Sequence, residues 1–137
     1  MDIRQVEPGF AVAPQLQPGD MAELARKGFV AVICNRPDGE DDGQPGVDAM
    51  RAAAESAGLA FHHIPVSGGQ FPDAAIDAFR SVRQAADGPV MAYCRTGTRS
   101  ITLETLANPE GRSASDRLGL ASAAGYDLSA LAGRLGD

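Results

Sequence analysis

The chain has 137 residues, 44% hydrophobic and 22% charged, a balance that excludes an intrinsically disordered segment and favours a single domain over residues 1–137. Its net charge of −6 excludes the broad basic surface needed for non-specific binding to nucleic acid or to an anionic membrane. The N-terminus lacks a signal-peptide pattern and no apolar run is long enough to span a membrane, so we expect a cytoplasmic protein.

The first half of the chain alternates short apolar runs with helical patterns. Residues 10–13 and 29–34 are apolar runs that predict buried strands. Between them, the spacing of apolar residues over 20–28 predicts a helix that ends at a glycine. Prolines, glycines and acids over 35–46 favour a surface loop, and the alanine-rich stretch 47–57 predicts the next helix.

The second half continues this alternation. Two more strands are predicted, at 59–66 and 89–93, and they are separated by a flexible loop and by a helix that ends before Gly88. Three helices complete the chain, over residues 100–107, 113–124 and 127–135. The pattern predicts a three-layer α/β/α fold in which helices cover both faces of a central, mostly parallel four-stranded sheet.

The most informative stretch is the turn after the last predicted strand, residues 94–100. Cys94 leaves an apolar run and enters a turn that contains Gly97, and a helix follows. A strand, a tight turn and a helix in this order direct backbone N–H groups and the positive end of the helix dipole at one spot. Helix N-termini and nearby arginines favour the thiolate form of cysteine, so Cys94 is the candidate nucleophile.

The arginines in this turn indicate an anionic substrate. Arg99 is predicted to be catalytic by holding the turn or the substrate, and Arg95 is predicted to face the incoming anion. Ser100 is expected to offer its hydroxyl to the thiolate. The predicted substrate-binding residues of the turn are Arg95, Thr96, Gly97, Thr98 and Ser100.

Two residues outside the turn are further candidates for substrate binding. Arg36 and Asp38 follow the predicted strand at 29–34, and ligands bind at the carboxyl edge of open parallel sheets. For any single acid in this loop, a merely solvated role is an equally good interpretation.

Cys34 and the two histidines have structural interpretations that we prefer. Cys34 could resolve an oxidised Cys94 by forming a disulfide, but a free cysteine is more often a small buried residue. His62 and His63 are adjacent in a predicted strand, so they point to opposite faces and cannot line one metal site. We therefore predict neither a metal nor a cofactor.

Three segments together resemble a known bacterial family. They are Val-Ile-Cys-Asn-Arg-Pro-Asp-Gly-Glu at 32–40, His-Ile-Pro-Val-Ser-Gly-Gly at 63–69 and Tyr-Cys-Arg-Thr-Gly-Thr-Arg-Ser at 93–100. With the tail at 124–128, they resemble the beta-lactamase hydrolase-like, phosphatase-like family over about residues 10–135. The resemblance implies the fold of dual-specificity tyrosine phosphatases. It also implies a role in bacterial sulfide metabolism, with a persulfide dioxygenase or a sulfide oxidoreductase as partner.

The spacing within the turn distinguishes two reactions. Four residues, 95–98, separate Cys94 from Arg99, whereas a phosphatase-type turn has one residue more. The shorter spacing is typical of rhodaneses, and a persulfide needs less room than a phosphate. The preferred hypothesis is therefore a rhodanese-type sulfurtransferase that moves sulfane sulfur from thiosulfate or a persulfide to a thiol through a Cys94 persulfide.

The residue after the third predicted strand favours the same hypothesis. Dual-specificity phosphatases have at this point an aspartate that protonates the leaving oxygen, and here Ser67 stands near that position. Asp73, Asp38 or Glu40 could act as a substitute acid. Sulfur transfer does not need that acid.

Two alternative functions stay open. The first is a tyrosine- or dual-specificity-type phosphatase that acts on a phosphorylated substrate, forms a phosphocysteine at Cys94 and binds phosphate through Arg99. The second is a non-catalytic module that senses anions or persulfides. For none of these functions do we expect nucleic acid or a membrane as a partner.

Overall fold

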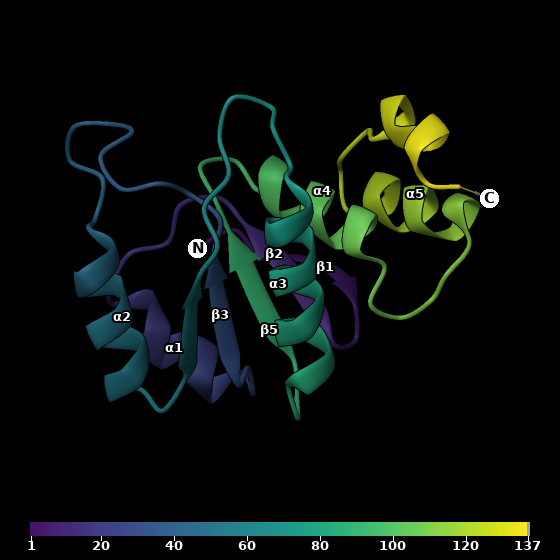
Figure 1. Cartoon of the computed structure of the whole chain (residues 1–137). Helices are drawn as coiled ribbons and strands as arrows, with labels where there is room; N and C mark the ends of the chain where they lie inside the picture. Colours follow the sequence, from purple (N-terminus) through teal and green to yellow (C-terminus); the bar gives the residue numbers. More distant parts are fainter. Residues whose placement is uncertain (137) are drawn as a thin grey trace.

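Residues 1–136 are described in a computed structural model, which has a five-stranded sheet between two layers of helices (Figure 1). The spatial order of the strands is β1-β2-β5-β3-β4, and the last four run parallel. These parallel strands are β2 (Phe10–Ala13), β5 (Val90–Tyr93), β3 (Ala31–Cys34) and β4 (Ala60–His63). The predicted parallel α/β architecture is confirmed.

A fifth strand, β1 (Arg4–Glu7), corrects the predicted four-stranded sheet. It pairs antiparallel with β2 at the edge, and its register shifts between Gln5 and Glu7. Val6 is its only apolar residue, and none of the strand is fully buried. The apolar pattern that reveals a central strand is therefore absent from this edge strand.

Within residues 1–136, five α-helices cover the two faces of the sheet (Figure 1). On one face lie α1 (Asp20–Arg26) and α2 (Val47–Ser56). On the other face lie α3 (Asp73–Ala85), α4 (Thr98–Ala107) and α5 (Ala114–Ala123). The last predicted helix is a short 3-10 segment, η1 (Ser129–Arg134). Over residues 1–136, none of the helices combines the length and apolar character needed to cross a membrane.

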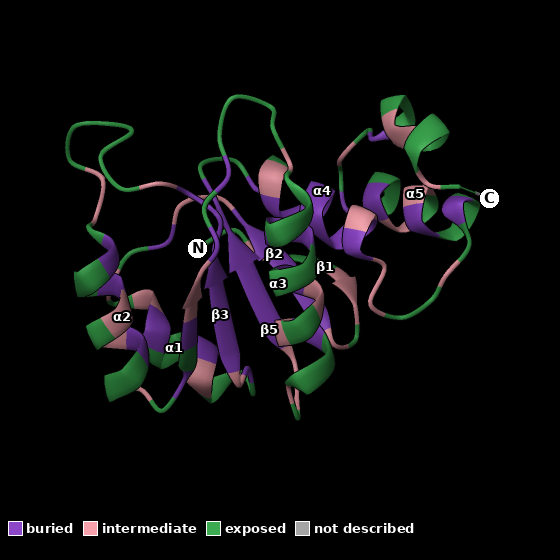
Figure 2. Cartoon of the chain, in the orientation of Figure 1, coloured by how far each residue is buried: buried purple, intermediate pink, exposed green. Residues whose placement is uncertain are grey.

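Two apolar clusters hold the layers together. Because side chains alternate along a strand, Phe10 and Ile33 pack toward α3 and α4, whereas Val32 and Met91 pack toward α1 and α2. Figure 2 shows that the central strands are buried, while much of the loops at their carboxyl ends is exposed. The central strand β5 is therefore buried between its neighbours, and its carboxyl end opens onto the exposed loops.

Candidate active site

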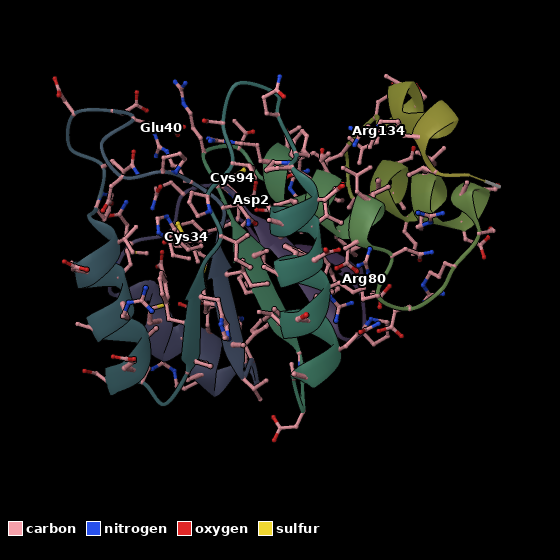
Figure 3. The ribbon with its side chains drawn as sticks, viewed as in Figure 1. Asp2, Cys34, Glu40, Arg80, Cys94 and Arg134 are labelled. Atoms are coloured by element: carbon pink, nitrogen blue, oxygen red, sulfur yellow. The ribbon has the colours of Figure 1, made fainter. Side chains whose placement is uncertain are left out.

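The turn that contains Cys94 lies between β5 and α4, at the carboxyl edge of the sheet (Figure 3). The Cys94 N–H donates to the carbonyl of Ala13 in β2 at 3.4 Å. On the other side, the Asn35 N–H beyond β3 donates to the Tyr93 carbonyl at 2.8 Å. Both neighbouring strands thus fix the backbone around the thiol, which is fully buried at 0% exposure.

Gly97 gives the turn its shape. It precedes α4 with a φ of 93°, a conformation that glycine adopts without steric cost. Its N–H donates to Cys94 Sγ at 3.1 Å. A backbone donor and the N-terminus of a ten-residue helix therefore face the sulfur, an arrangement that favours a thiolate or a bound anion.

Arg99 is held between two loops. Its Nη1 and Nη2 donate to the two carboxylate oxygens of Glu40 at 2.8 and 2.9 Å, and Nη1 also donates to the Val66 carbonyl at 2.9 Å. None of these three hydrogen bonds involves Nε–H or the second hydrogen of Nη2, which lie on one edge of the guanidinium. Glu40 raises the pKa of Arg99, and the guanidinium also interacts with the Cys94 thiol. Arg99 thus lies close enough to affect the candidate nucleophile, and its Nε–H is not used by Glu40 or by Val66.

Glu40 is an ionised partner of Arg99 and not a proton donor. Its carboxylate also accepts from Arg36 Nε at 2.8 Å. Against a smaller opposing effect of burial, Arg99 and Arg36 lower the pKa of Glu40 to about 2. A lowered pKa leaves this carboxyl ionised at neutral pH, which argues against the suggested role of Glu40 as a substitute acid.

Arg36 and Asp38 shape the loop after β3, and their role in substrate binding stays a prediction. The Arg36 side chain is only 3% exposed and donates to Glu40, to Gln15 Oε1 at 2.8 Å and to Asp41 Oδ2 at 2.6 Å. Asp38 Oδ1 accepts from the first N–H of α2 at 2.8 Å. Both side chains are engaged within the protein, and Arg36 holds Glu40, the partner of Arg99.

Ser100 differs from its predicted role. Its hydroxyl donates to Asn35 Oδ1 at 2.9 Å and not to the thiolate. Asn35 Nδ2 in turn donates to the Ile64 carbonyl at 2.9 Å, and both Asn35 and Ser100 are fully buried. Asn35 therefore joins α4 to the chain beyond β3 and β4. Its position directly after a predicted strand was the only sequence signal for it.

The other turn residues lie at the surface. The hydroxyls of Thr96 and Thr98 are 3.1 Å apart, and each of these two residues is exposed. The Arg95 side chain is 66% exposed, with its Nε 3.6 Å from Asp41 Oδ2. Their contacts with a substrate stay predictions.

Cys34 and Cys94 point to opposite faces of the sheet. Cys34 is the register partner of Tyr93, and both pack in the cluster against α1 and α2. Cys94 follows Tyr93 and so continues on the other face. Figure 3 shows Cys94 at the turn and Cys34 below it on the α2 side. Burial raises the pKa of Cys34, and this favours the inert, buried interpretation over a resolving disulfide.

Comparison with known proteins agrees with this architecture. The family model "Beta-lactamase hydrolase-like protein, phosphatase-like domain" matches residues 2–110. The chain belongs to this family. The domain is 37% identical over 130 residues to the beta-lactamase hydrolase-like protein of Xylella fastidiosa, an alignment that covers 93% of this chain and 30% of that protein. The chain thus spans about three tenths of the length of the curated relatives that it matches.

Two solved structures illustrate the fold of this domain. A protein of Neisseria meningitidis, provisionally named a phosphatase, is 35% identical with a TM-score of 0.84, covering 99% of this chain and 97% of that one. A cysteine-to-serine variant of Pseudomonas aeruginosa TpbA in complex with phosphotyrosine is 18% identical with a TM-score of 0.64, covering 98% and 90%. The predicted phosphatase-like fold is confirmed. These likenesses favour the phosphatase alternative over the sulfurtransferase hypothesis.

Proposed function

We propose that this domain is a cysteine-dependent phosphatase that hydrolyses aryl phosphate monoesters. The observation that carries the proposal is the placement of Cys94 at the N-terminus of α4, with the Gly97 N–H 3.1 Å from Sγ and the Arg99 guanidinium near enough to interact with the thiol. A helix N-terminus and a guanidinium edge are groups that bind phosphate oxygens. Membership of a phosphatase-like family adds support.

The proposed reaction has two steps. The Cys94 thiolate attacks phosphorus, and the bond between phosphorus and the leaving oxygen breaks. The turn and Arg99 hold the remaining phosphate oxygens while charge redistributes. Water then attacks the phosphocysteine, which releases inorganic phosphate and restores the thiolate. The leaving oxygen takes its proton from water.

The substrate class that we propose depends on which carboxyl group could protonate the leaving oxygen. A side chain that protonates the leaving oxygen accelerates such reactions by about 10² to 10⁴. Glu40 is ionised and Asp38 is bound to α2, so Asp73, exposed in the first turn of α3, is the one suggested acid still open to that role. Aryl phosphates release a weakly basic oxygen and depend least on a proton donor.

The test compares p-nitrophenyl phosphate with an alkyl phosphate such as phosphoserine. Wild-type protein is expected to hydrolyse the aryl ester faster, and Cys94→Ser is expected to abolish turnover. Cys34→Ala is the matched control, because Cys34 lies on the opposite face of the sheet, and it should retain activity. Turnover that survives in Cys94→Ser, or no turnover by wild type, would contradict the proposal.

Sulfur transfer is a second candidate, favoured by the four residues between Cys94 and Arg99. In this reaction, the Cys94 thiolate attacks the outer sulfur of thiosulfate, the sulfur–sulfur bond breaks, and sulfite leaves. Cyanide or a thiol then removes the sulfur from the Cys94 persulfide. Mass spectrometry separates the two candidates, because Cys94 would gain about 32 Da from thiosulfate but about 80 Da from a phosphate ester.

A further inference from the structure

The segment after α5 brings Tyr126 against the turn that contains Cys94. The Tyr126 N–H donates to the Ala121 carbonyl at 2.9 Å, which anchors the segment to the end of α5. Arg4 Nη1 in β1 donates to the Ala124 carbonyl at 3.2 Å, which anchors it to the sheet. Tyr126 is half-buried and packs against the apolar cluster below the turn. The segment that carries Tyr126 is therefore anchored from two sides.

The tip of the Tyr126 ring contacts two consecutive residues of the turn. Its Oη donates to the Thr96 carbonyl at 2.9 Å. At the next residue, a Cβ added to Gly97 would overlap the Tyr126 hydroxyl. The glycine that gives the turn its shape thus also makes room for the tyrosine.

These contacts lie on one peptide unit. The Thr96 carbonyl and the Gly97 N–H belong to the same planar trans peptide and point in opposite directions. The carbonyl accepts from Tyr126 at 2.9 Å while the N–H donates to Cys94 Sγ at 3.1 Å. Hydrogen bonds in series polarise one another, so the tyrosine both orients this peptide and strengthens its N–H as a donor.

Tyr126 is well suited to donate at neutral pH. Burial raises the pKa of its hydroxyl, with a smaller opposing effect of Arg4, and the neighbouring Cys94 raises it further. The hydroxyl therefore keeps its proton over the whole range in which Cys94 would act. Its donation to the Thr96 carbonyl is a constant feature of the site.

We propose that Tyr126 is a positioning residue that stabilises the Cys94 thiolate through the Thr96–Gly97 peptide. The chain of atoms from Tyr126 Oη through this peptide to Cys94 Sγ is called the tyrosine relay below. The inference rests on the proposed role of Cys94 as nucleophile and applies equally to phosphate and to sulfur transfer. It makes the segment after α5 part of the active site.

The test removes one oxygen atom from the relay. Tyr126→Phe keeps the ring and loses the donor, and iodoacetamide reports the thiolate by forming a carbon–sulfur bond with release of iodide. At about pH 7, alkylation of Cys94 should slow by about 2- to 10-fold, the effect of weakening one hydrogen bond. At a pH that ionises the thiol fully, the variant and wild type should react at the same rate. Mass spectrometry assigns the label to Cys94.

Ser113→Ala is the matched control. Ser113 Oγ accepts from the Asp116 N–H at 3.0 Å and caps α5, so this variant loosens the same part of the chain without touching the turn. It should alkylate at the wild-type rate. Equal rates for Tyr126→Phe and wild type at pH 7 would overturn the relay. Slowing by Ser113→Ala as large as that by Tyr126→Phe would also overturn it.

Activity supplies a separate readout. For p-nitrophenyl phosphate, Tyr126→Phe should lower kcat by the same factor by which it slows alkylation of Cys94. KM should stay nearly unchanged, because Tyr126 does not touch the substrate. If wild type proves inactive, the proposed reaction fails, but the alkylation rates still decide on the relay. A higher KM for p-nitrophenyl phosphate without slower alkylation would contradict the tyrosine relay.

Amide exchange keeps the inference testable if Tyr126→Phe does not fold, which its melting curve reveals. In wild-type protein, the Gly97 N–H should be protected from exchange and should lose protection when Cys94 is carboxymethylated. Unchanged exchange at Gly97 after carboxymethylation would overturn the relay.

Discussion

Two arginines on the same side of the sheet are each bound by a glutamate, yet they use different edges of the guanidinium. Arg83 in α3 gives Nε and Nη2 to Glu104 at 2.7 and 3.0 Å. Arg99 in α4 gives Nη1 and Nη2 to Glu40 at 2.8 and 2.9 Å. The edge formed by Nε and Nη2 is thus bound to a glutamate in Arg83. In Arg99, the glutamate binds the other end of the guanidinium, Nη1 and Nη2, and does not use Nε.

Arg83 is also more deeply buried than Arg99 and has more partners within the protein. The Arg83 side chain is 4% exposed, lies over the Phe10 ring at 4.7 Å, and is also within 3.3 Å of Glu7 and 3.8 Å of Glu110. It ties β1, α3 and α4 together. The Arg99 side chain is 20% exposed among the loops at the sheet edge.

This difference shows how one residue type serves two purposes in a single fold. An arginine whose edges are met by protein carboxylates inside the core holds elements together. An arginine whose Nε–H is not used by a protein carboxylate is oriented by the protein and still offers donors to a ligand. The following predictions test this distinction.

The largest expected effect is on stability, from Arg83→Met. Removing one partner of a buried ion pair leaves Glu104 unpaired and should cost about 3 to 5 kcal/mol in the free energy of unfolding. Activity of the folded protein should be unchanged. Urea denaturation measures the loss. Arg80→Met is the control, because it removes a surface ion pair with Asp77 and one hydrogen bond to the Ala107 carbonyl, each worth about 1 kcal/mol.

Arg99→Lys should show the opposite profile. Lysine keeps the charge but loses the paired donors, so kcat/KM for p-nitrophenyl phosphate should fall by about 10²-fold. The free energy of unfolding should change by less than about 1 kcal/mol. Arg95→Lys, at an exposed position, should lose much less activity. A stability loss at Arg99 as large as that at Arg83 would remove the distinction.

Replacing Glu40 should change how the stability of the protein depends on pH under acidic conditions. Its pKa is lowered to about 2 from 4.5, so between these values the unfolded chain binds more protons than the folded one. The ion pair therefore contributes fully above about pH 4.5 and is lost as pH falls toward 2. Glu40→Gln should flatten this part of the stability curve in urea denaturation at a series of pH values. Parallel curves for the variant and wild type would show that the pair contributes nothing.

Asp38→Ala should have the smallest effect. Loss of its bond to the first N–H of α2 should cost about 1 kcal/mol, as for other helix caps. Because Asp38 is engaged at α2, KM for p-nitrophenyl phosphate should not change. A several-fold rise in KM would support Asp38 as a substrate-binding residue.

Local patterns in the sequence determined most of the fold and the centre of the site. Apolar runs and helical spacing depend on neighbouring residues, so the parallel strands and α1 to α5 could be predicted. The turn with Cys94, Gly97 and Arg99 was found for the same reason, since its backbone donors come from consecutive residues. The edge strand β1 was missed because its residues are mostly polar and give no apolar pattern. Its pairing with β2 is what makes it a strand.

Only the tertiary structure decided which partners complete the site. Glu40 lies 59 positions from Arg99, Asn35 lies 65 from Ser100, and Tyr126 lies 30 from Thr96. Each of these pairs forms because separate strands and loops converge at one end of the sheet, and no local pattern records that convergence. Packing of distant segments therefore determined which edge of Arg99 stays open and which tyrosine reaches the turn.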